Sequence, residues 1–320
     1  MMKKLFLYLS VFVILANNGC KGGRALPQSA GRRDDVILIV PDEIKTDSLK
    51  KVLEHSEYYP SREEVYRVSE YLPPQLSQYK YWRNIVIVGS LGDTYIDKLL
   101  SEESKRSIAE GGGLFYEEDL WVDLQSVAII AGRGREETQR FVNQYGETIY
   151  QLFRNKERER FEKVLYLDDF QRQKSEKMEK LLGASFKIPL GYRISKEEDH
   201  FMTYIRKSPD RLVTLYYRIE PILDPVEFRD SLFALYFEGD RVYAPMTRIY
   251  KVRFDKITAY KIEGIWQNME KVMGGPFISY VFEKDGIWYF LDGHVFVPGK
   301  KKWVYLEEVD IILHTFKKGF

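Results

Sequence analysis

The sequence predicts two domains of different fold class: an N-terminal three-layer α/β domain with a partly parallel sheet, and a C-terminal α+β domain with an antiparallel sheet and packed helices. Length is the first observation, because 320 residues exceed the usual size of one domain. The second is a change of pattern near Gly183, from continuous apolar runs to short alternating segments. With 44% hydrophobic residues, both halves can build a buried core.

In the first half, three runs rich in Val and Ile predict strands, at residues 36–40, 84–88 and 126–131. Runs that are apolar on both faces are typical of strands covered on both sides. An amphipathic segment at 44–53 and an alternating segment at 64–71 lie between the first two runs. This alternation of strands and helices predicts a layered sheet with at least partly parallel order.

Two helices are predicted to follow these strands. From Thr138 to Phe153, apolar residues recur at helical spacing, which predicts one amphipathic helix. Residues 156–180 are dense in charge with a sparse apolar stripe, which predicts a solvated helix that ends at Gly183. We therefore assign residues 35–183 to the N-terminal domain, including this charged linking helix.

The second half, residues 184–320, alternates between short strands and two helices. Asp285-Gly286 lies between two alternating runs and predicts a hairpin. One helix is predicted from Pro225 and another over 303–317. The predicted strands are 186–188, 201–206, 212–219, 247–254, 258–266, 277–282 and 287–297. By analogy of layout alone, the arrangement loosely resembles Mog1 and PsbP, and such an analogy carries no function.

Gly274-Gly275-Pro276 is predicted to form a tight corner between two strands. Glycine enters backbone regions closed to other residues, and proline fixes φ and removes a hydrogen-bond donor. We expect this corner, with Trp266 and the strands that lead to Asp292 and His294, to border a binding surface. A plain connecting turn is the alternative.

Asp292 and His294 are two residues apart on a predicted strand, so their side chains share one face. A carboxylate beside an imidazole is how a general base is often oriented. An exposed polar face is the alternative, and no serine or cysteine in a recognisable nucleophile turn accompanies the pair. The sequence therefore assigns no catalytic residue.

No metal or cofactor is expected. The four histidines, at positions 55, 200, 294 and 314, form no close pair on one helix or strand. Gly132 and Gly134 follow a predicted strand as in a dinucleotide-binding loop, but Glu136 and Glu137 at the helix start would repel a phosphate.

The N-terminus reads as an export signal. A basic start and an apolar run at residues 5–16 lead to Cys20, the only cysteine, at the position where a lipoprotein signal peptidase would leave the mature N-terminus. The run is shorter than the ~20 apolar residues of a membrane span. We expect a signal peptide over 1–19, lipid attachment (such as palmitate) at Cys20 and a flexible tether over 20–34.

Four short sequence motifs follow the lipoprotein-like signal. Together they resemble the domain of unknown function 4837 family of exported bacterial lipoproteins, to which no activity is assigned. The resemblance implies a match over nearly the whole mature chain. In chain order the motifs are Arg83-Asn84-Ile85-Val86-Ile87-Val88, Arg229-Asp230-Ser231, Gly264-Ile265-Trp266 and Met273-Gly274-Gly275-Pro276-Phe277.

These observations favour an exported protein held in a bacterial envelope membrane by its N-terminal acyl chains, with folded domains in the periplasm. A net charge of +1 invites no nucleic acid. We expect binding or scaffolding of an unknown envelope protein or ligand. The alternatives are an envelope hydrolase that uses carboxylate or histidine residues of the C-terminal domain, and a purely structural envelope component.

Overall fold

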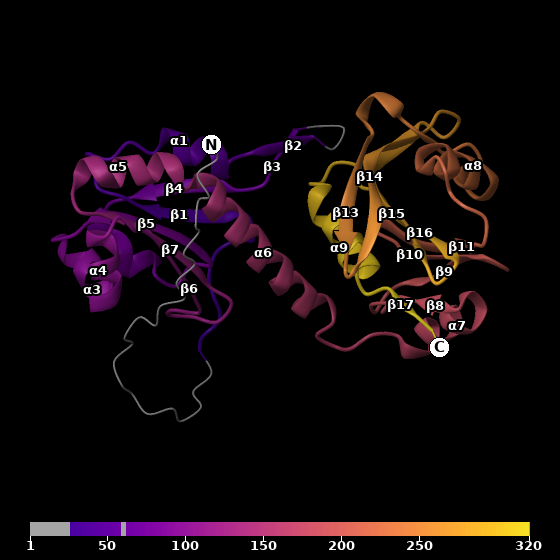
Figure 1. The fold of residues 1–320 in the computed structure, drawn as a ribbon, viewed down its shortest axis with the longest axis horizontal. Coiled ribbons are helices and arrows are strands. Elements are labelled where there is room, and N and C mark those ends of the chain that lie inside the picture. Colours follow the sequence, from indigo (N-terminus) through magenta and orange to yellow (C-terminus); the bar gives the residue numbers. More distant parts are fainter. Residues whose placement is uncertain (1–25, 59–61, 320) are drawn as a thin grey trace. The chain divides into compact units, whose positions relative to one another are not determined.

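The computed structural model describes residues 26–58 and 62–319 and divides into two compact units (Figure 1). The first unit comprises described residues up to 56 together with 64–157, and the second comprises the described part of 57–63 together with 158–319. The signal predicted over 1–19 and Cys20 lie outside the described residues. Within the described residues, no helix is both long and apolar enough to cross a bilayer.

The first unit is built on a five-stranded sheet in which four strands are parallel and the fifth, at one edge, is antiparallel. In sheet order the strands are β4 (Arg67–Tyr71), β1 (Asp35–Ile39), β5 (Asn84–Ser90), β7 (Ser126–Gly132) and β6 (Leu114–Glu118). Every residue of β5 and β7 is buried. The partly parallel α/β sheet predicted for this half is confirmed.

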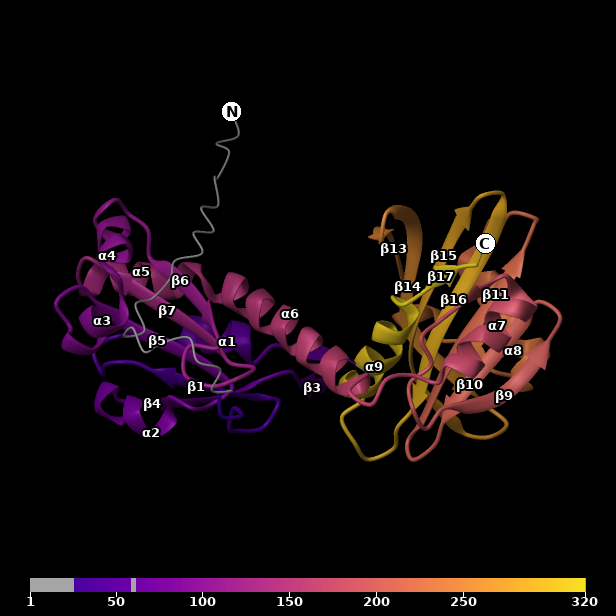
Figure 2. The same cartoon turned by 90° about the horizontal axis from the view of Figure 1, so that it is seen from below.

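Helices cover both faces of this sheet (Figure 2). On one face α1 (Asp47–Leu53) and α5 (Arg135–Gln144) pack on the Val side chains of the central strands. On the other face α2 (Leu76–Tyr79), α3 (Thr94–Leu99) and α4 (Glu102–Ala109) pack on the Ile side chains. Alternate residues of a strand point to opposite faces of the sheet, so each apolar strand contributes side chains to the hydrophobic cores on both faces. Shorter elements are β2 (Ser56–Tyr58), β3 (Arg62–Glu64) and η1 (Pro73–Gln75).

The described part of the tether predicted over 20–34 is bonded to the first unit. The Ala30 N–H donates to the Tyr81 carbonyl at 2.8 Å, and the Asp123 N–H donates to the Pro27 carbonyl at 2.8 Å. Asp34 is buried. The Gly, Pro and Ser residues of this stretch give no periodic pattern of apolar side chains from which a strand could be predicted. Its backbone N–H and carbonyl groups can still form hydrogen bonds with neighbouring segments.

Two predicted helix boundaries are wrong. The helix predicted from Thr138 to Phe153 is broken at Tyr145, between α5 and α6 (Gly146–Leu165). The charged stretch supplies the end of α6 and a separate helix, α7 (Arg172–Leu182), which Gly183 ends with φ +65°. α7 buries Met178 and Leu182 in the core of the second unit, so the units divide after Glu157, within α6, and not at Gly183.

The second unit holds an eight-stranded antiparallel sheet, as predicted for an α+β domain. Its main path is β12 (Arg241–Val242), β14 (Ile257–Asn268), β15 (Met273–Lys284), β16 (Ile287–Phe296), β11 (Asp210–Arg218), β10 (Phe201–Arg206) and β9 (Arg193–Glu198), and β13 (Arg248–Phe254) also pairs with β14. β9 was not predicted because its residues are mostly charged and exposed. Small elements complete the unit: β8 (Ala184–Ser185) paired with β17 (Lys317–Lys318), and η2 (Ala244–Met246).

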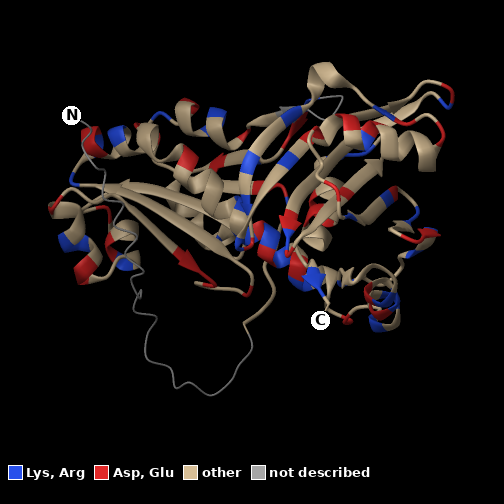
Figure 3. Cartoon of the chain, turned by 45° about the vertical axis from the view of Figure 1, so that its right-hand side comes forward, with Lys and Arg blue, Asp and Glu red and all other residues tan. Residues whose placement is uncertain are grey.

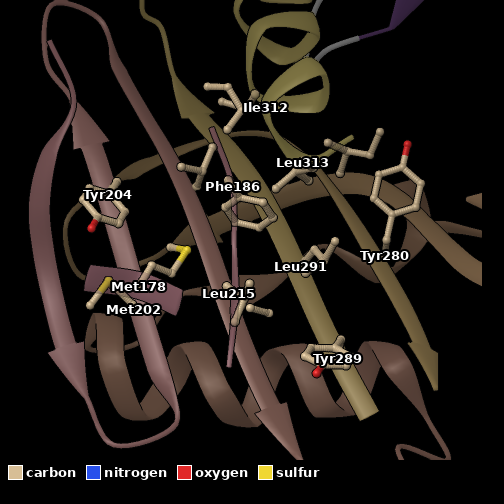
Figure 4. Packing of buried hydrophobic residues seen from close by; sticks show 14 of the residues in the cluster. Met178, Phe186, Met202, Tyr204, Leu215, Tyr280, Tyr289, Leu291, Ile312 and Leu313 are labelled. Carbon is tan, nitrogen blue, oxygen red and sulfur yellow. The ribbon is translucent and has the colours of Figure 1, made fainter. Parts of the chain in front are cut away.

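Helices also cover both faces of the second sheet. α8 (Pro225–Phe237) covers one face; its first turn is capped by Asp224, whose carboxylate accepts the N–H groups of Val226 and Glu227. α7 and α9 (Trp303–Leu313) cover the other face. Figure 4 shows Ile312 and Leu313 of α9 in the same apolar cluster as Leu215 and Leu291 of the sheet.

The Gly274-Gly275-Pro276 corner does not exist, because these residues lie inside strand β15. They pair with Gln267, Trp266 and Ile265 of β14, and the turn lies earlier, at residues 269–272. The glycines serve close backbone approach instead of a bend. A Cβ on Gly275 would lie 2.0 Å from the Val295 carbonyl oxygen, and one on Gly274 would lie 2.6 Å from the Trp266 carbonyl oxygen.

Charged residues of both signs are interspersed over the elements of both units (Figure 3). Many of them form pairs, such as Arg133 with Glu137 and Arg135 with Asp93.

Candidate functional site

The second unit carries the candidate site on the sheet face beneath α8. Asp292 and His294 both belong to β16 and point to this face. Their side chains are in contact, with the His294 Nδ1 2.8 Å from the Asp292 Oδ1. Three phenylalanine and tryptophan rings surround the imidazole edge-on, from Phe233, Phe237 and Trp266, at centroid distances of 5.2, 5.7 and 5.6 Å.

Asp292 is fully buried and is satisfied by three side chains. Its Oδ2 accepts the Nε–H of Arg229 at 2.8 Å and the hydroxyl of Ser279 at 2.6 Å, in addition to the Oδ1 contact with His294. Burial by itself raises the pKa of Asp292, but the charge of Arg229 and the hydrogen bonds outweigh burial and hold that pKa below its ordinary value. Asp292 is therefore an ionised carboxylate at neutral pH.

Arg229 supports the carboxylate from α8 and is itself fully buried. Its guanidinium lies between two aromatic rings, 3.8 Å from the Phe277 centroid and 4.3 Å from the Phe233 centroid. The Nη1 and Nη2 atoms find no hydrogen-bond partner among the described residues. Ring faces replace those partners, since the negative face of an aromatic ring attracts a guanidinium. Arg229 and Asp292 thus form a buried ion pair between the helix and the sheet.

The ionised Asp292 fixes the tautomer of His294. A carboxylate can only accept, so the hydrogen in the Nδ1 contact belongs to the imidazole. In the neutral ring Nε2 is then a hydrogen-bond acceptor. This arrangement holds one nitrogen rigidly and leaves the other available on the opposite side of the ring.

His294 lines a cavity of about 340 Å³ between the sheet and the end of α8. The described residues that line it come from α8, from β9, β10, β11, β14, β15 and β16, and from three of the connections beside them: Ser195, Ile205, Lys207, Asp210, Leu212, Tyr236, Phe237, Glu238, Asp240, Trp266, Lys271, Met273, His294 and Phe296. Because Nδ1 is engaged by Asp292, the ring edge that His294 presents to the cavity is the Nε2 edge. Aromatic and aliphatic side chains form about half of the wall, and polar and charged side chains form the rest.

The residues proposed from the sequence fall into three groups. Trp266 and His294 line the cavity, and the Trp266 Nε1–H donates to the Val295 carbonyl at 3.1 Å, which fixes the ring. Asp292 lies behind His294 and does not line the cavity. Gly274, Gly275 and Pro276 do not line it either; they allow β14, β15 and the end of β16 to approach closely.

Sequence reasoning did not assign a role to Arg229, Ser279 or Asp240. Arg229 stood within a predicted helix, where one arginine among charged residues gives no signal of burial. A weak signal for Ser279 was present, since it alternates with apolar residues in a strand and therefore points to a covered face. Asp240 follows the helix end, and only the fold brings it to the cavity.

The first unit places a carboxylate where the two-glycine loop would receive a phosphate. The backbone N–H of Arg133 and its guanidinium donate to Glu137 at the start of α5, at 2.9 and 2.8 Å. These hydrogen bonds from the side chain and backbone of Arg133 lower the pKa of Glu137 to about 2. An ionised carboxylate thus occupies the beginning of α5. In the part of the chain that the structure describes, no group of three or more His, Cys, Asp or Glu residues is arranged to hold a metal ion.

Comparison with solved structures finds similar but distant proteins. PsbP from Synechocystis is 10% identical, with 42% of this chain and 86% of that chain covered and a TM-score of 0.31. The Ran-binding protein Mog1p from Saccharomyces cerevisiae is 8% identical, with 42% and 90% covered and a TM-score of 0.30. LpqN from Mycobacterium tuberculosis, described as involved in cell envelope biogenesis, is 12% identical, with 42% and 82% covered and a TM-score of 0.28. The chain spans 47% of the length of a similar Bacteroides thetaiotaomicron protein, and 43% of this chain is covered, at 7% identity and a TM-score of 0.28.

Comparison with curated proteins gives no match. Two protein families match the chain, one in each half. Residues 29–166 match the family described as Domain of unknown function (DUF8532). Residues 171–315, which carry the candidate site, match Domain of unknown function (DUF4837). The match to the expected DUF4837 family is confirmed, but it is confined to the second half of the chain. The motif that begins at Arg83 lies in the region that matches DUF8532. The C-terminal half of the chain is thus similar to the DUF4837 family and the N-terminal half to the DUF8532 family.

Proposed function

We propose that this is a lipid-anchored cell-envelope protein that acts by binding a small ligand in the cavity of its C-terminal domain. The anchor rests on the signal-like residues 1–19 and on Cys20. Binding rests on the cavity and on the imidazole that Asp292 orients at its wall. The membrane would be one partner, through the acyl chains, and the bound ligand the other.

The observation that carries the binding function is an imidazole held in a fixed orientation at the wall of a cavity that has both aromatic and polar lining residues. Ligand sites are typically clefts of ~300–1,000 Å³, lined by apolar and aromatic side chains with a few placed polar groups. At about 340 Å³ the cavity lies in the lower part of this range, and it combines Trp266, Phe237 and Phe296 with the Nε2 edge of His294. Holding His294 requires a buried ion pair, which is an expensive way to support a residue that only packs.

General-base hydrolysis is the second candidate. It is favoured by the Asp292–His294 contact, since a carboxylate that holds Nδ1–H leaves Nε2 ready to take a proton from a bound water. Binding remains the better account because, among the described residues, no Ser, Thr, Tyr or Cys side chain forms a hydrogen bond with His294. A hydrolase at this site would have to use His294 to activate a water molecule, which then attacks the substrate directly.

Retention of small molecules tests the binding function. Ser195 lies in β9 at an irregularity of the β9–β10 pairing and is an exposed residue of the cavity lining, so Ser195→Trp should fill the cavity without disturbing the core. Protein extracted from its own membranes should carry a ligand detectable by native mass spectrometry, and Ser195→Trp should carry none. Thr258→Trp, at an exposed site outside the cavity lining, is the control and should keep the ligand. Equal retention by wild type and Ser195→Trp would contradict the proposal, and no retained mass in either would favour a purely structural role.

A further inference from the structure

Asp240 is a buried carboxylate in the cavity lining that lacks a cation. It is 7% exposed, and its Oδ1 accepts one hydrogen bond, from the Asn268 Nδ2 at 2.7 Å. No Lys, Arg or His side chain of the described chain lies within ion-pair distance of it. A buried charge that lacks an opposite charge is costly, so the site favours a bound cation.

The other charged side chains in the lining are already paired with each other. The Lys207 Nζ lies 2.5 Å from the Asp210 Oδ2, and the Lys271 Nζ lies 3.1 Å from the Glu238 Oε2. Apart from His294, the lining therefore carries a net charge of one negative unit, that of Asp240. No basic side chain in the lining is left over to receive an anionic ligand.

The end of α8 lies beside Asp240, and the Lys196 ammonium partly offsets the negative potential of this helix end. The helix runs through Phe237 and ends at Glu238, whose left-handed conformation (φ +51°) turns the chain toward Asp240. The carbonyl end of a helix carries partial negative charge. Two of its carbonyls already have partners, since Lys196 donates to the Tyr236 carbonyl and Asn268 to the Glu238 carbonyl. These contacts hold the helix end in place beside the cavity.

The uncharged part of the lining suits the rest of such a ligand. Aromatic faces attract cations, and Tyr236, Phe237, Trp266 and Phe296 all line the cavity. The Nε2 of neutral His294 is a second acceptor for an N–H group. We propose that the cavity binds an organic amine in its ammonium form, with the charged nitrogen at Asp240 and an apolar body against the aromatic wall. This inference rests on the proposed binding function and names the ligand class for the same site.

Three probes of the same size and shape test the ligand class by titration calorimetry at neutral pH: benzylammonium, benzyl alcohol and benzoate. The full chain should bind benzylammonium most tightly, benzyl alcohol less tightly and benzoate least. Asp240→Asn keeps an amide oxygen for the Asn268 hydrogen bond and removes only the charge. It should weaken benzylammonium about tenfold or more and leave benzyl alcohol nearly unchanged. Asp255→Asn, outside the cavity lining at an exposed hairpin tip, is the matched control and should bind like the wild type.

The outcomes separate the ligand class from the binding function. If benzyl alcohol or benzoate binds as tightly as benzylammonium, and Ser195→Trp abolishes that binding, the cavity is a binding site but the ammonium assignment is overturned. If benzylammonium binds equally well to Asp240→Asn, or does not bind the wild type at all, the assignment is also overturned. Loss of ligand retention in the membrane-extraction experiment tests the binding function on its own, because it requires no probe.

Discussion

Asp310 is a second buried carboxylate of the C-terminal unit, on the sheet face opposite the site. Its Oδ2 accepts from the Arg158 Nη1 at 2.6 Å, and its Oδ1 accepts from the Tyr280 hydroxyl at 2.7 Å. Burial raises the pKa of Asp310, but the hydrogen bond and charge of His314, the charge of Arg158 and the Tyr280 hydroxyl outweigh burial and hold it well below its ordinary value. Asp292 and Asp310 thus each stabilise the fold only while ionised.

These two depressed pKa values predict loss of stability in acid. A carboxyl group whose pKa is lower in the folded than in the unfolded state contributes stability that is fully present above its unfolded pKa of about 4, and that is lost as the pH falls toward its folded pKa. The free energy of unfolding of the C-terminal unit, from urea titrations, should be steady from pH 7 to about 5 and fall between about pH 4 and 2. Asp310→Asn should flatten this fall. A free energy that stays constant down to about pH 3 would contradict the assignment of both groups.

A side chain at position 275 should destabilise the C-terminal unit by a steric clash with the backbone. Gly275→Val places a side chain where even the Cβ would lie 2.0 Å from the Val295 carbonyl oxygen, so β15 and β16 must separate. We expect the C-terminal unit to lose about 2–3 kcal/mol of unfolding free energy in a denaturant titration. Thr258→Val, at an exposed strand position, is the control and should change it by no more than about 0.5 kcal/mol. Equal stabilities for the two variants would show that the strands can separate freely at Gly275.

At the scale of elements, α7 decides where the C-terminal unit begins. Met178 is fully buried in the core that α7, α9 and the sheet share, whereas Gln173 of the same helix is exposed. Met178→Ala should lower the unfolding free energy of the C-terminal unit by about 2–5 kcal/mol, and Gln173→Ala should leave it nearly unchanged. The measurement is chemical unfolding followed by the fluorescence of the tryptophans in that unit. If Met178→Ala instead destabilises only the N-terminal unit, the boundary predicted at Gly183 is the right one.

The sequence predicts the type of most elements, because periodicity records which faces are covered. The runs at 84–88 and 201–206 coincide with strands of the structure. Periodicity could not separate α5 from α6, since the break at Tyr145 interrupts no apolar stripe. It also could not tell a bend from close strand packing at Gly275, as both require an absent side chain.

The site was predictable only in part, because local sequence patterns do not record tertiary contacts. Strand alternation places Asp292 and His294 on one face, which is a local property. The contact with Arg229 joins residues 63 positions apart, and the approach of Asp240 to the same cavity depends on how α8 ends. These features arise from tertiary packing, which no local pattern encodes.

For the whole molecule, the anchor predicts where the protein is found in the cell. Cys20→Ser removes the thiol that would carry the lipid, so the protein should leave the membrane fraction and appear in the soluble periplasmic fraction. Ser29→Ala, which removes a hydroxyl outside the proposed signal, is the control and should remain membrane-bound. Immunoblots of fractionated cells make the measurement. Continued membrane retention of Cys20→Ser would place the anchor elsewhere.

The proposed function of the whole molecule requires that His294 presents a free Nε2 acceptor to a ligand. Nitrogen NMR of the full chain with ¹⁵N-labelled histidine measures this directly at neutral pH. We expect His294 to show a protonated Nδ1 and an unprotonated Nε2, and we expect the Nε2 resonance to shift when benzylammonium is added to the wild type but not to Ser195→Trp. A hydrogen on Nε2 with a bare Nδ1, or an Nε2 resonance that does not move while the probe binds, would contradict the account.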